Sequence, residues 1–350
     1  MRATTQRMAL LETLGKVKSA VAGKHPLPVC TAVLIRAGGG QLTLVGTDLE
    51  VALTASCKAT IGRQGAVAAT PKDLEAFLKL AKADTVTLSL VGKNSLRIEA
   101  GSAATTLEGY AAEDFPPLPG AKGKPVTVNG LSDALRQISY AVAKKDHRPV
   151  LTGVLFDPRN GKMALAAADG YRLAETTVKM KGQLEQTIVP RKAVLLIEKL
   201  MPGKISIHRD ERNISFVGDG LVLTAEAIKG TFPNYQQIIP KGGSALTVDS
   251  AALKDALNTV AVTMPANRAI RLLARGGKLS VSTKSDERGQ TEVKVPAKGK
   301  VKIAFDAKFL KDLLNKAGTE LTLRTTNAQS PGVVKQNGTV HVVMPLFVEW

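Results

Sequence analysis

The chain has 350 residues, of which 44% are hydrophobic and only 4% aromatic. This composition excludes an intrinsically disordered chain and favours cores built from Val, Leu, Ile and Ala in two or three domains. The net charge of +18 indicates polyanionic partners, above all nucleic acid, although a basic surface without a partner is the alternative.

Membrane insertion and secretion are not expected. Apolar runs such as residues 193–197 are far too short to span a bilayer, and residues 1–20 lack the continuous apolar core of a secretory signal. The two cysteines, Cys30 and Cys57, have no CxxC spacing and do not form a disulfide framework. We therefore expect a protein of the reducing cytoplasm.

One pattern occurs twice at a constant offset. Pro28-Val29-x-Thr31-x-Val33-Leu34 returns as Pro149-Val150-x-Thr152-x-Val154-Leu155, an offset of 121 residues (149 − 28), and the same offset relates Asp48 to Asp169. A fixed offset without gaps indicates domain duplication. Domains over residues 1–122, 123–245 and 246–350 are predicted, with the proline-rich residues 116–125 as a linker.

Each predicted domain begins with a helical pattern that gives one apolar stripe. Ser132 and Asp249-Ser250 are candidate N-caps. The stripe positions are Met8, Leu11, Leu14 and residues 17–21 in the first domain, Leu131, Leu135, Ile138 and Val142 in the second, and Leu253, Leu257 and Val260 in the third.

A glycine-containing hairpin follows each of these helices. The paired strands are 32–35 with 41–45, 153–156 with 162–166, and 270–274 with 278–282. A phosphate-binding loop is the alternative reading of these glycines, but no helix start follows them and no GxGxxG or GxxxxGK[ST] motif occurs.

A second helix is predicted in each domain, over residues 71–82, 191–200 and 307–316, with Pro71 and Pro190 at helix starts. Further strands include 85–90, 95–99, 204–208 and 213–217. Each third thus shows helix, strands, helix, strands, which predicts an α+β class.

Five segments in this order resemble the bacterial DNA sliding clamp, the beta subunit of DNA polymerase III. They are Gly46-Thr47-Asp48-Leu49-Glu50, Ala168-Asp169-Gly170-Tyr171-Arg172-Leu173, Val189-Pro190-Arg191-Lys192, Phe232-Pro233-Asn234-Tyr235 and Val343-Met344-Pro345-Leu346. The resemblance implies a homodimeric ring of three repeated clamp domains per chain, with helices lining the hole and sheets outside. Six helices of about 10 Å diameter enclose a hole of only roughly 9 Å, whereas twelve enclose roughly 28 Å. Because one DNA groove is about 12 Å wide, only the ring of two chains admits a duplex.

The resemblance also implies that basic residues face the DNA and contact phosphates without reading sequence. An ordinary solvated helix face is the alternative for any single lysine. The candidates are Lys24, Lys72, Lys79, Lys144, Lys145, Arg148, Arg191, Lys192, Lys308 and Lys311.

A pocket for short linear peptides of the replicative polymerase, the clamp loader and repair proteins is implied between the second and third domains. The alternative for Leu151, Leu173 and Ile238 is an ordinary core role. The matching positions are Leu151, Gly170, Tyr171, Arg172, Leu173, Pro233, Gln237, Ile238, Val342, Met344, Pro345 and Leu346.

The dimer contact implied by the resemblance maps to Thr105 and Leu107 of the first domain and to Val262 and Thr263 of the third. The sequence departs from the family in its high basic charge, in Gln237, and in the extension 347–350. Leu346-Phe347 resembles the anchor pair of clamp-binding peptides, so we expect this tail to compete for the pocket. A mobile chain end is the alternative.

No catalytic or metal-binding pattern stands out. The four histidines lie far apart and no GxSxG or HExxH motif occurs. Asp48 and Asp169 each follow a strand, where an aspartate commonly caps a turn. We expect a non-catalytic, cofactor-free processivity factor at the cytoplasmic nucleoid. A monomeric or weakly dimeric clamp-like DNA-binding adaptor, serving repair or a mobile element, is the alternative.

Overall fold

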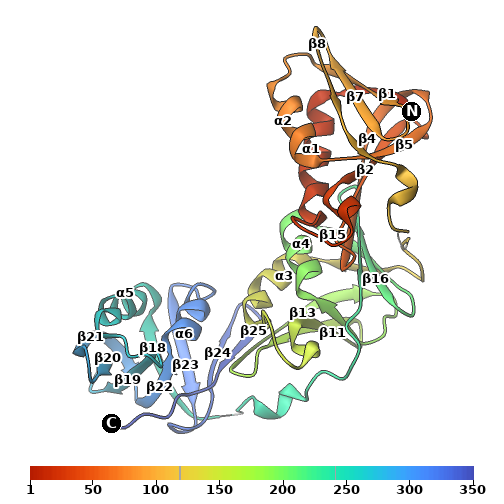
Figure 1. Ribbon diagram of the computed structural model, residues 1–350. Helices are drawn as coiled ribbons and strands as arrows, with labels where there is room; N and C mark the ends of the chain where they lie inside the picture. Colours follow the sequence, from red (N-terminus) through yellow and green to blue (C-terminus); the bar gives the residue numbers. More distant parts are fainter. Residues whose placement is uncertain (118–119, 241) are drawn as a thin grey trace. The chain divides into compact units, whose positions relative to one another are not determined.

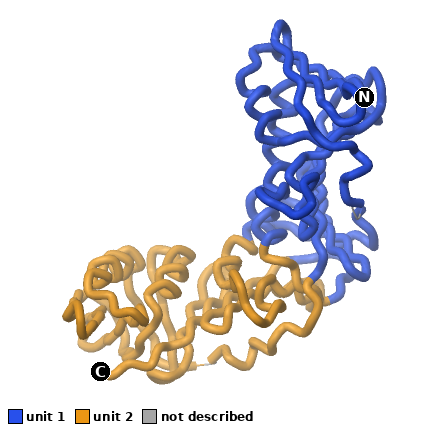
Figure 2. Tube along the Cα trace, viewed as in Figure 1, with its two compact units in different colours: residues 1–133, 179–185, 192–227 blue, residues 134–178, 186–191, 228–350 orange. Residues whose placement is uncertain are grey.

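The computed structural model describes residues 1–117, 120–240 and 242–350. The contacts between Cα atoms divide the chain into two compact units, shown in Figure 2: unit 1 comprises residues 1–133, 179–185 and 192–227, and unit 2 comprises residues 134–178, 186–191 and 228–350. Part of the predicted linker, residues 118–119, lies outside the described residues, and the three domain boundaries remain a prediction. No helix in the described ranges is long and apolar enough to cross a membrane.

Unit 1 contains two complete helices and antiparallel strands from the first two sequence repeats (Figure 1). Its elements are β1 (Arg2–Gln6), α1 (Arg7–Val17), β2 (Val33–Gly38), β3 (Gln41–Thr47), β4 (Val51–Arg63), β5 (Gly65–Ala69), α2 (Pro71–Leu80), β6 (Thr85–Val91), β7 (Ser95–Ala100), β8 (Ala103–Leu107), β9 (Gly109–Tyr110), β10 (Val126–Asn129), β15 (Lys204–Arg209), β16 (Asn213–Gly218) and β17 (Leu221–Glu226).

Unit 2 contains the remaining strands and helices. Its elements are β11 (Gly153–Arg159), β12 (Lys162–Ala168), β14 (Thr187–Pro190), β18 (Ser244–Asp249), α5 (Ser250–Val260), β19 (Ala269–Arg275), β20 (Lys278–Ser285), β21 (Gly289–Gly299), β22 (Val301–Asp306), α6 (Ala307–Leu314), β23 (Glu320–Thr325), β24 (Gly332–Gln336) and β25 (Thr339–Val343). Three elements have residues in both units: α3 (Leu131–Ile138), β13 (Arg172–Lys181) and α4 (Arg191–Leu200).

The three predicted hairpins are confirmed. Strand β2 pairs with β3, β11 with β12, and β19 with β20, each through a two-residue turn. Both turn residues have positive φ in every case, as a type I′ turn requires, and the positions are Gly39-Gly40, Asn160-Gly161 and Gly276-Gly277. The glycines therefore form hairpin turns and not a phosphate-binding loop.

The apolar stripe of the first helix needs a correction. The buried residues of α1 are Leu10, Thr13, Leu14 and Val17, whereas Met8 is 60% exposed and Leu11 is only half-buried. The helix ends at Val17 and continues as a 3₁₀ turn, η1 (Lys18–Ala20). The stripe is thus set by the face that packs on α2 and β4, which the one-dimensional spacing did not specify.

The other two first helices follow the predicted stripes. All four predicted positions of α3 and its 3₁₀ extension η4 (Ser139–Ala141) are buried, as are the three positions of α5. Asp249 caps α5, because its carboxylate accepts a hydrogen bond from the Ala252 amide at 2.7 Å. Ser132 does not cap α3: it lies inside the helix, and its hydroxyl donates to the carbonyl oxygen of Glu198 at 3.1 Å.

The second helices begin as predicted at Pro71, Arg191 and Ala307, and α2 and α6 end two residues earlier than expected. Asp306 caps α6 by accepting from the Lys308 amide. Sequence patterns missed the short strands β1, β10 and β18 that open each repeat, because four to six residues with several threonines give no strong alternation.

Two long strands join different sequence repeats within a unit. The first residues of β4 pair with β17 in unit 1, and the first residues of β13 pair with β25 in unit 2. The 3₁₀ turns η2 (Pro28–Thr31), η5 (Pro149–Thr152), η3 (Ala112–Asp114), η6 (Tyr235–Ile238) and η7 (Ala261–Thr263) complete the connections. These cross-repeat pairings position the candidate sites described below.

The corrected stripe of α1 predicts the effect of two truncations. Leu14→Ala should lower the free energy of unfolding by about 2–5 kcal/mol, because it removes a fully buried side chain and leaves a cavity. Met8→Ala, on the exposed face of the same helix, should change it by less than about 0.5 kcal/mol. Urea denaturation measures both values. A larger loss of unfolding free energy for Met8→Ala than for Leu14→Ala would contradict the corrected stripe.

Candidate partner-binding and DNA-facing sites

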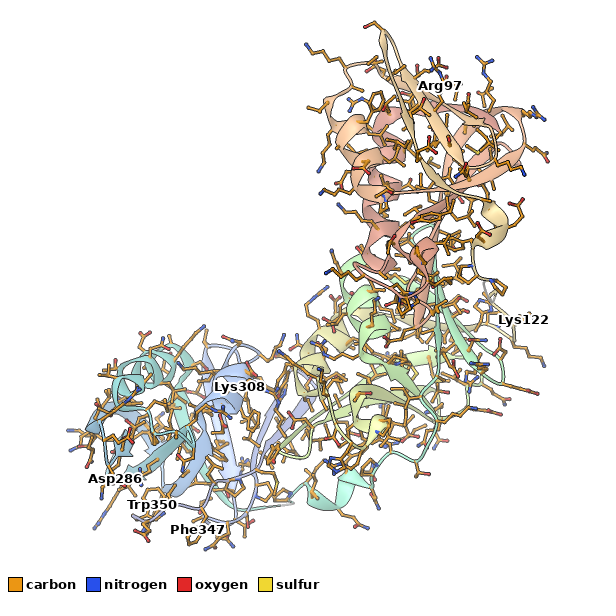
Figure 3. The ribbon with its side chains drawn as sticks, in the orientation of Figure 1. Arg97, Lys122, Asp286, Lys308, Phe347 and Trp350 are labelled. Carbon is orange, nitrogen blue, oxygen red and sulfur yellow. The ribbon has the colours of Figure 1, made fainter. Side chains whose placement is uncertain are left out.

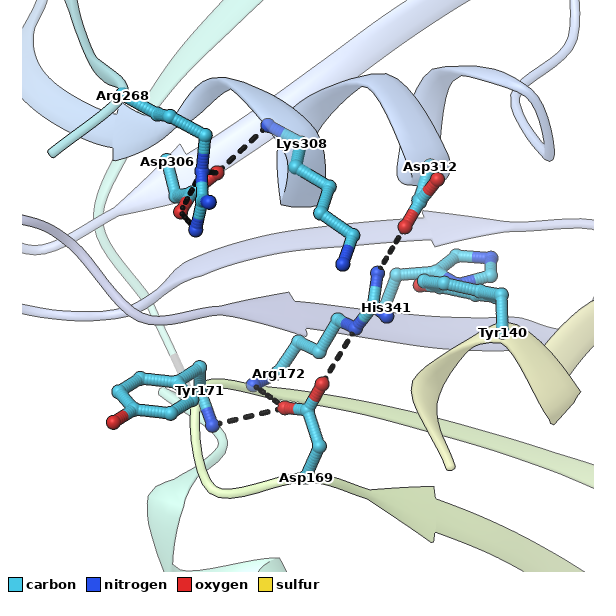
Figure 4. Close-up of polar contacts among 9 residues, drawn as sticks. All are labelled: Tyr140, Asp169, Tyr171, Arg172, Arg268, Asp306, Lys308, Asp312 and His341. Carbon is cyan, nitrogen blue, oxygen red and sulfur yellow. Dashed lines mark hydrogen bonds and ion pairs between the residues drawn. The ribbon is translucent and has the colours of Figure 1, made fainter. Parts of the chain in front are cut away.

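Arg172 is the centre of a buried polar cluster in unit 2 (Figure 4). Its guanidinium contacts the Asp169 carboxylate at 2.9 Å through Nε and the Asp312 carboxylate at 2.5 Å through Nη1. The same group lies 5.1 Å from the ring centre of Tyr140 and 4.8 Å from that of Phe309, within cation–π range. Only 8% of Arg172 is exposed. This side chain therefore links β13 to α6 and is not free to orient a peptide as predicted.

The two repeated aspartates have the structural role expected of them. Asp48 accepts a hydrogen bond from the Val51 amide at 3.0 Å, and Asp169 accepts from the amides of Tyr171 and Arg172 at 3.0 Å each. Each carboxylate thus caps the turn that precedes a long strand. The second oxygen of each also contacts a cation, Lys192 for Asp48 and Arg172 for Asp169.

A buried histidine extends the cluster in unit 2. The Tyr140 hydroxyl lies 2.9 Å from Nδ1 of His341 on β25; His341 is buried and Tyr140 is half-buried. Burial raises the pKa of the Tyr140 phenol, so this hydroxyl stays protonated at pH 7. Burial, together with the nearby Lys316, lowers the pKa of His341 to about 4. His341 is therefore neutral at pH 7 and shares one hydrogen bond with the Tyr140 hydroxyl through Nδ1.

The predicted pocket residues separate into buried and accessible groups. Leu151, Leu173 and Val342 are buried together in one apolar cluster with Phe232 and Tyr235, so the core role applies to the first two. Ile238 is 46% exposed, and Tyr171 and Met344 are exposed as well. The remaining accessible or half-buried members are Gly170, Pro233, Gln237, Pro345 and Leu346.

Tyr171 joins the accessible members to the last repeat. Its ring stacks on Phe309 with centroids 5.9 Å apart, and its carbonyl oxygen accepts a hydrogen bond from the Met344 amide at 2.8 Å. Accessible Tyr171, Met344 and Ile238 therefore remain the better candidates for peptide contact, with the Leu151, Leu173 and Val342 core behind them.

The C-terminal extension lies along the last repeat. The Leu346 amide donates to the carbonyl oxygen of Ala304, Arg271 donates to the carbonyl oxygen of Glu349, and Lys302 lies 4.8 Å from the ring centre of Trp350. Phe347 is 85% exposed, and Figure 3 shows it near Trp350 at the chain end. Phe347 therefore does not occupy the predicted pocket as an anchor.

The candidate DNA-facing residues differ in how free their charges are. Lys79 forms an ion pair with Glu75 at 2.8 Å, Arg148 with Asp146 at 3.1 Å, and Lys192 with Asp48. The half-buried Arg191 has a buried Nε without a hydrogen-bond partner in the described part of the chain, so it is not the exposed residue that its helical position suggested. The exposed remainder is Lys24, Lys72, Lys144, Lys145 and Lys308, with Lys311 half-buried.

The candidate dimer residues lie on two different kinds of element. Thr105 and Leu107 are half-buried on β8, which pairs on one side with β7. Val262 is exposed on η7, but Thr263 is buried and its hydroxyl lies 2.8 Å from that of Thr283 and 2.9 Å from that of Thr291. Thr263 therefore holds η7 against the strands of its own unit, and we remove it from the candidate dimer contact.

Sequence reasoning missed Tyr140, Phe309, Asp312 and His341. Tyr140 and His341 are separated by 201 positions in the chain, and no local spacing relates them. Among the residues that the structure describes, no group of three His, Cys, Asp or Glu side chains is placed to hold a metal ion.

The buried histidine predicts a dependence of stability on pH. Because the pKa of His341 is lowered from 6.5 to about 4, the unfolded chain binds more protons between these values, and stability is lost as pH falls from 6.5 towards 4. Between pH 7 and pH 4.5, the wild type should lose about 2–3 kcal/mol more than His341→Gln, which cannot titrate. Urea unfolding of both proteins at both pH values tests this. The carboxylates titrate in the wild type and in the variant alike, so their contribution to the loss of stability cancels. Equal losses would contradict it.

Comparison with known proteins identifies the family. Residues 1–119, 125–234 and 236–346 match the models of the N-terminal, central and C-terminal domains of the DNA polymerase III beta subunit. The beta sliding clamp of Pseudomonas putida is 30% identical and that of Pseudomonas aeruginosa 29% identical, each over 99% of this chain and 100% of the relative.

Solved structures agree with this result. The DNA polymerase III beta subunit of Pseudomonas aeruginosa superposes with a TM-score of 0.94 at 27% identity, covering 99% of this chain and 100% of that one. The sliding clamp of Bartonella birtlesii bound to griselimycin gives 0.93 at 26% identity, covering 99% and 100%. These matches confirm the three-domain clamp fold, and the chain therefore belongs to the beta sliding clamp family, the beta subunits of DNA polymerase III.

Proposed function

We propose that two copies of this chain close head to tail into a ring that encircles duplex DNA without reading its sequence. The chain is a non-catalytic sliding clamp of the DNA polymerase III beta type, and the ring tethers the replicative polymerase, the clamp loader and repair proteins through short peptides. We place it at the cytoplasmic nucleoid. The ring is supported by one kind of strand pairing between sequence repeats. This pairing occurs once within each unit, and the two strand edges that would form it a third time have no partner in the described residues.

The pairing follows the same rule in both units. In unit 1, Leu221 to Ala225 of β17 lie opposite Ala55 to Val51 of β4. In unit 2, Val340 to Val343 of β25 lie opposite Glu175 to Arg172 of β13. In each case the last strand of one repeat pairs with the start of the long strand of the preceding repeat. The two registers are equivalent when the repeats are aligned on their hairpin turns.

The open edges are β8 and the first half of β21. In the described residues, β8 pairs with β7, and residues 289–294 of β21 pair with β20 alone. β21 is aligned on β4 through the strands that pair with them, since Pro296 lies opposite Lys278 as Lys58 lies opposite Gln41. Transferring the β4–β17 register then aligns Leu107 with Gly289, Thr105 with Thr291 and Ala103 with Val293. The faces agree, because Thr105 and Thr291 are both half-buried while Ala104 and Glu292 are both exposed.

An unpaired strand edge is a template for pairing with another chain. If each copy offers β8 at one end and β21 at the other, two copies close a ring with two identical interfaces. This arrangement brings together twelve helices, enough for a hole of roughly 28 Å. It replaces Thr263 by Thr291 as the third-domain residue opposite Thr105, and leaves Val262 outside the strand pairing.

A cysteine pair tests this register. Thr106→Cys with Gln290→Cys places two thiols on the exposed face of opposite strands, so mild oxidation should give a covalent dimer of twice 36.9 kDa. Thr106→Cys with Thr291→Cys is the matched control, since its thiols point to opposite faces. The native Cys30 and Cys57 are buried.

Retention on DNA then tests encirclement. The ring oxidised in the presence of a plasmid should stay on circular DNA through a high-salt wash, because a closed ring is held without ionic contacts. It should be lost after the plasmid is linearised, because it can slide off a free end. Cross-linking by the control pair alone would overturn the register. Equal retention on both DNA forms would support the clamp-like adaptor instead.

The exposed lysines predict a second result. Replacing Lys24, Lys144 and Lys145 by Ala should weaken DNA binding equally across sequences and reduce its dependence on salt, because phosphate neutralisation releases counterions. These residues lie at equivalent turns of the first two repeats and are exposed. Unfolding free energy should stay within about 0.5 kcal/mol of the wild type.

A triple variant with the same change in net charge is the control. Lys58→Ala, Lys162→Ala and Lys278→Ala remove three exposed lysines from strands β4, β12 and β20. In a ring with sheets outside, these changes should alter DNA affinity much less. Equal weakening by the two triple variants would mean that only net charge matters, and would remove the turn lysines from the DNA-facing set.

A further inference from the structure

Unit 1 contains a cavity of about 410 Å³ at the meeting point of three segments. These segments are the turn before β4, with Leu49 and Glu50, the prolines at 116–117, and the end of β17 with Glu226. A volume of this size is typical of a site that binds a small ligand or a few side chains of a peptide. The cavity lies wholly within unit 1.

The internal repeat relates this cavity to the predicted partner pocket of unit 2. The offset of 121 residues aligns Leu49 with Gly170 and Glu50 with Tyr171. The repeated Phe-Pro pairs align Pro116 with Pro233, and the turns before β17 and β25 align Glu226 with Met344. The same backbone framework therefore occurs in both units, but its side chains differ in chemistry.

The lining of the unit 1 cavity carries two carboxylates, Glu50 and Glu226, and one guanidinium, Arg212, where its counterpart is apolar or basic. Glu50 and Glu226 stand in place of Tyr171 and Met344, and Val51 stands in place of Arg172. Glu226 forms an ion pair with Arg212 at 2.9 Å. No hydrogen bond or ion pair holds the Glu50 carboxylate in the described ranges, and Lys192 is paired with Asp48 instead.

An accessible apolar side chain adjoins the Glu50 carboxylate. Leu49 is 55% exposed and has a φ of 72°, a conformation that is uncommon for leucine. Glu50 is exposed, yet partial desolvation and the neighbouring Asp48 raise its pKa, with Lys192 acting in the opposite direction. A cation placed beside this carboxylate would relieve the unfavourable environment.

We propose that this cavity is a second peptide site, which binds an extended segment carrying a lysine or arginine next to an apolar side chain. Glu50 would contact the cation and Leu49 the apolar side chain. Because Arg212 balances Glu226, the Glu50 carboxylate leaves the lining with a net negative charge. On a chain of net charge +18 this charge disfavours DNA phosphate locally and suits the basic segment of a protein partner. The site depends neither on ring closure nor on the partner pocket of unit 2.

Peptides of defined charge test the site on the full-length chain. The probe is fluorescein-labelled Ala-Leu-Lys-Leu-Lys-Ala with a blocked C-terminus, and its partner carries glutamate in place of both lysines. We expect fluorescence polarisation to detect binding of the lysine peptide only. Glu50→Gln should weaken this binding about tenfold, because it removes a charge-assisted contact, and Glu50→Lys should abolish it.

Two further variants separate the site from general charge attraction. Leu49→Asn should weaken binding while keeping the turn, since asparagine tolerates positive φ. Glu99→Gln removes a half-buried carboxylate of β7, paired with Arg97, in the same unit and outside the cavity, and should leave binding unchanged. Equal binding of the two peptides, or equal weakening by Glu50→Gln and Glu99→Gln, would overturn the proposal. Neither outcome affects the retention test of the ring.

Discussion

The structure depends on the need of each strand edge to find a partner. In both units the last strand of one repeat completes the sheet of the preceding repeat, β17 on β4 and β25 on β13. Backbone hydrogen bonds, and not particular side chains, make this contact, which explains how repeats of divergent sequence keep the same pairing. The residues that face each other still supply packing, since Leu53 and Leu223 are both fully buried.

A buried charge cluster adds specificity to the pairing in unit 2. Arg172 is held by Asp169 on its own turn and by Asp312 on α6, with two aromatic rings beside its guanidinium. Burying such charges has a desolvation cost that offsets much of their attraction. The cluster is therefore better understood as a device that fixes α6 relative to β13 than as a source of net stability. It also places Tyr171 against Phe309, where the accessible candidates for peptide contact lie.

The charge of the chain is not uniformly available to DNA. Several basic residues at helix positions are paired with carboxylates, as Lys79 is with Glu75 and Lys192 with Asp48. Lys24, Lys144 and Lys145 lie exposed in the turns around residues 24 and 145, where a lysine can reach a phosphate without leaving an ion pair. In contrast, the cavity beside Glu50 carries the opposite charge. One basic chain can thus present distinct surfaces to nucleic acid and to proteins.

The sequence by itself determined the elements whose signals are local. Two-residue turns with glycine specified the hairpins, the apolar spacing specified α3 and α5, and the 121-residue offset showed the duplication. The position of Asp48 and Asp169 directly after a strand identified both as turn caps. Local signals suffice here because each feature depends on residues a few positions apart.

Only the tertiary structure decided which candidate side chains are accessible. Leu173 and Ile238 are similar residues in sequence, yet one is fully buried against residues of another repeat and the other is exposed. Arg172 contacts Asp312 and Phe309, which lie on α6 more than a hundred residues away in the sequence. The face of α1 was likewise set by its packing on α2 and β4. Burial depends on contacts between distant segments, and a one-dimensional pattern records no such contact.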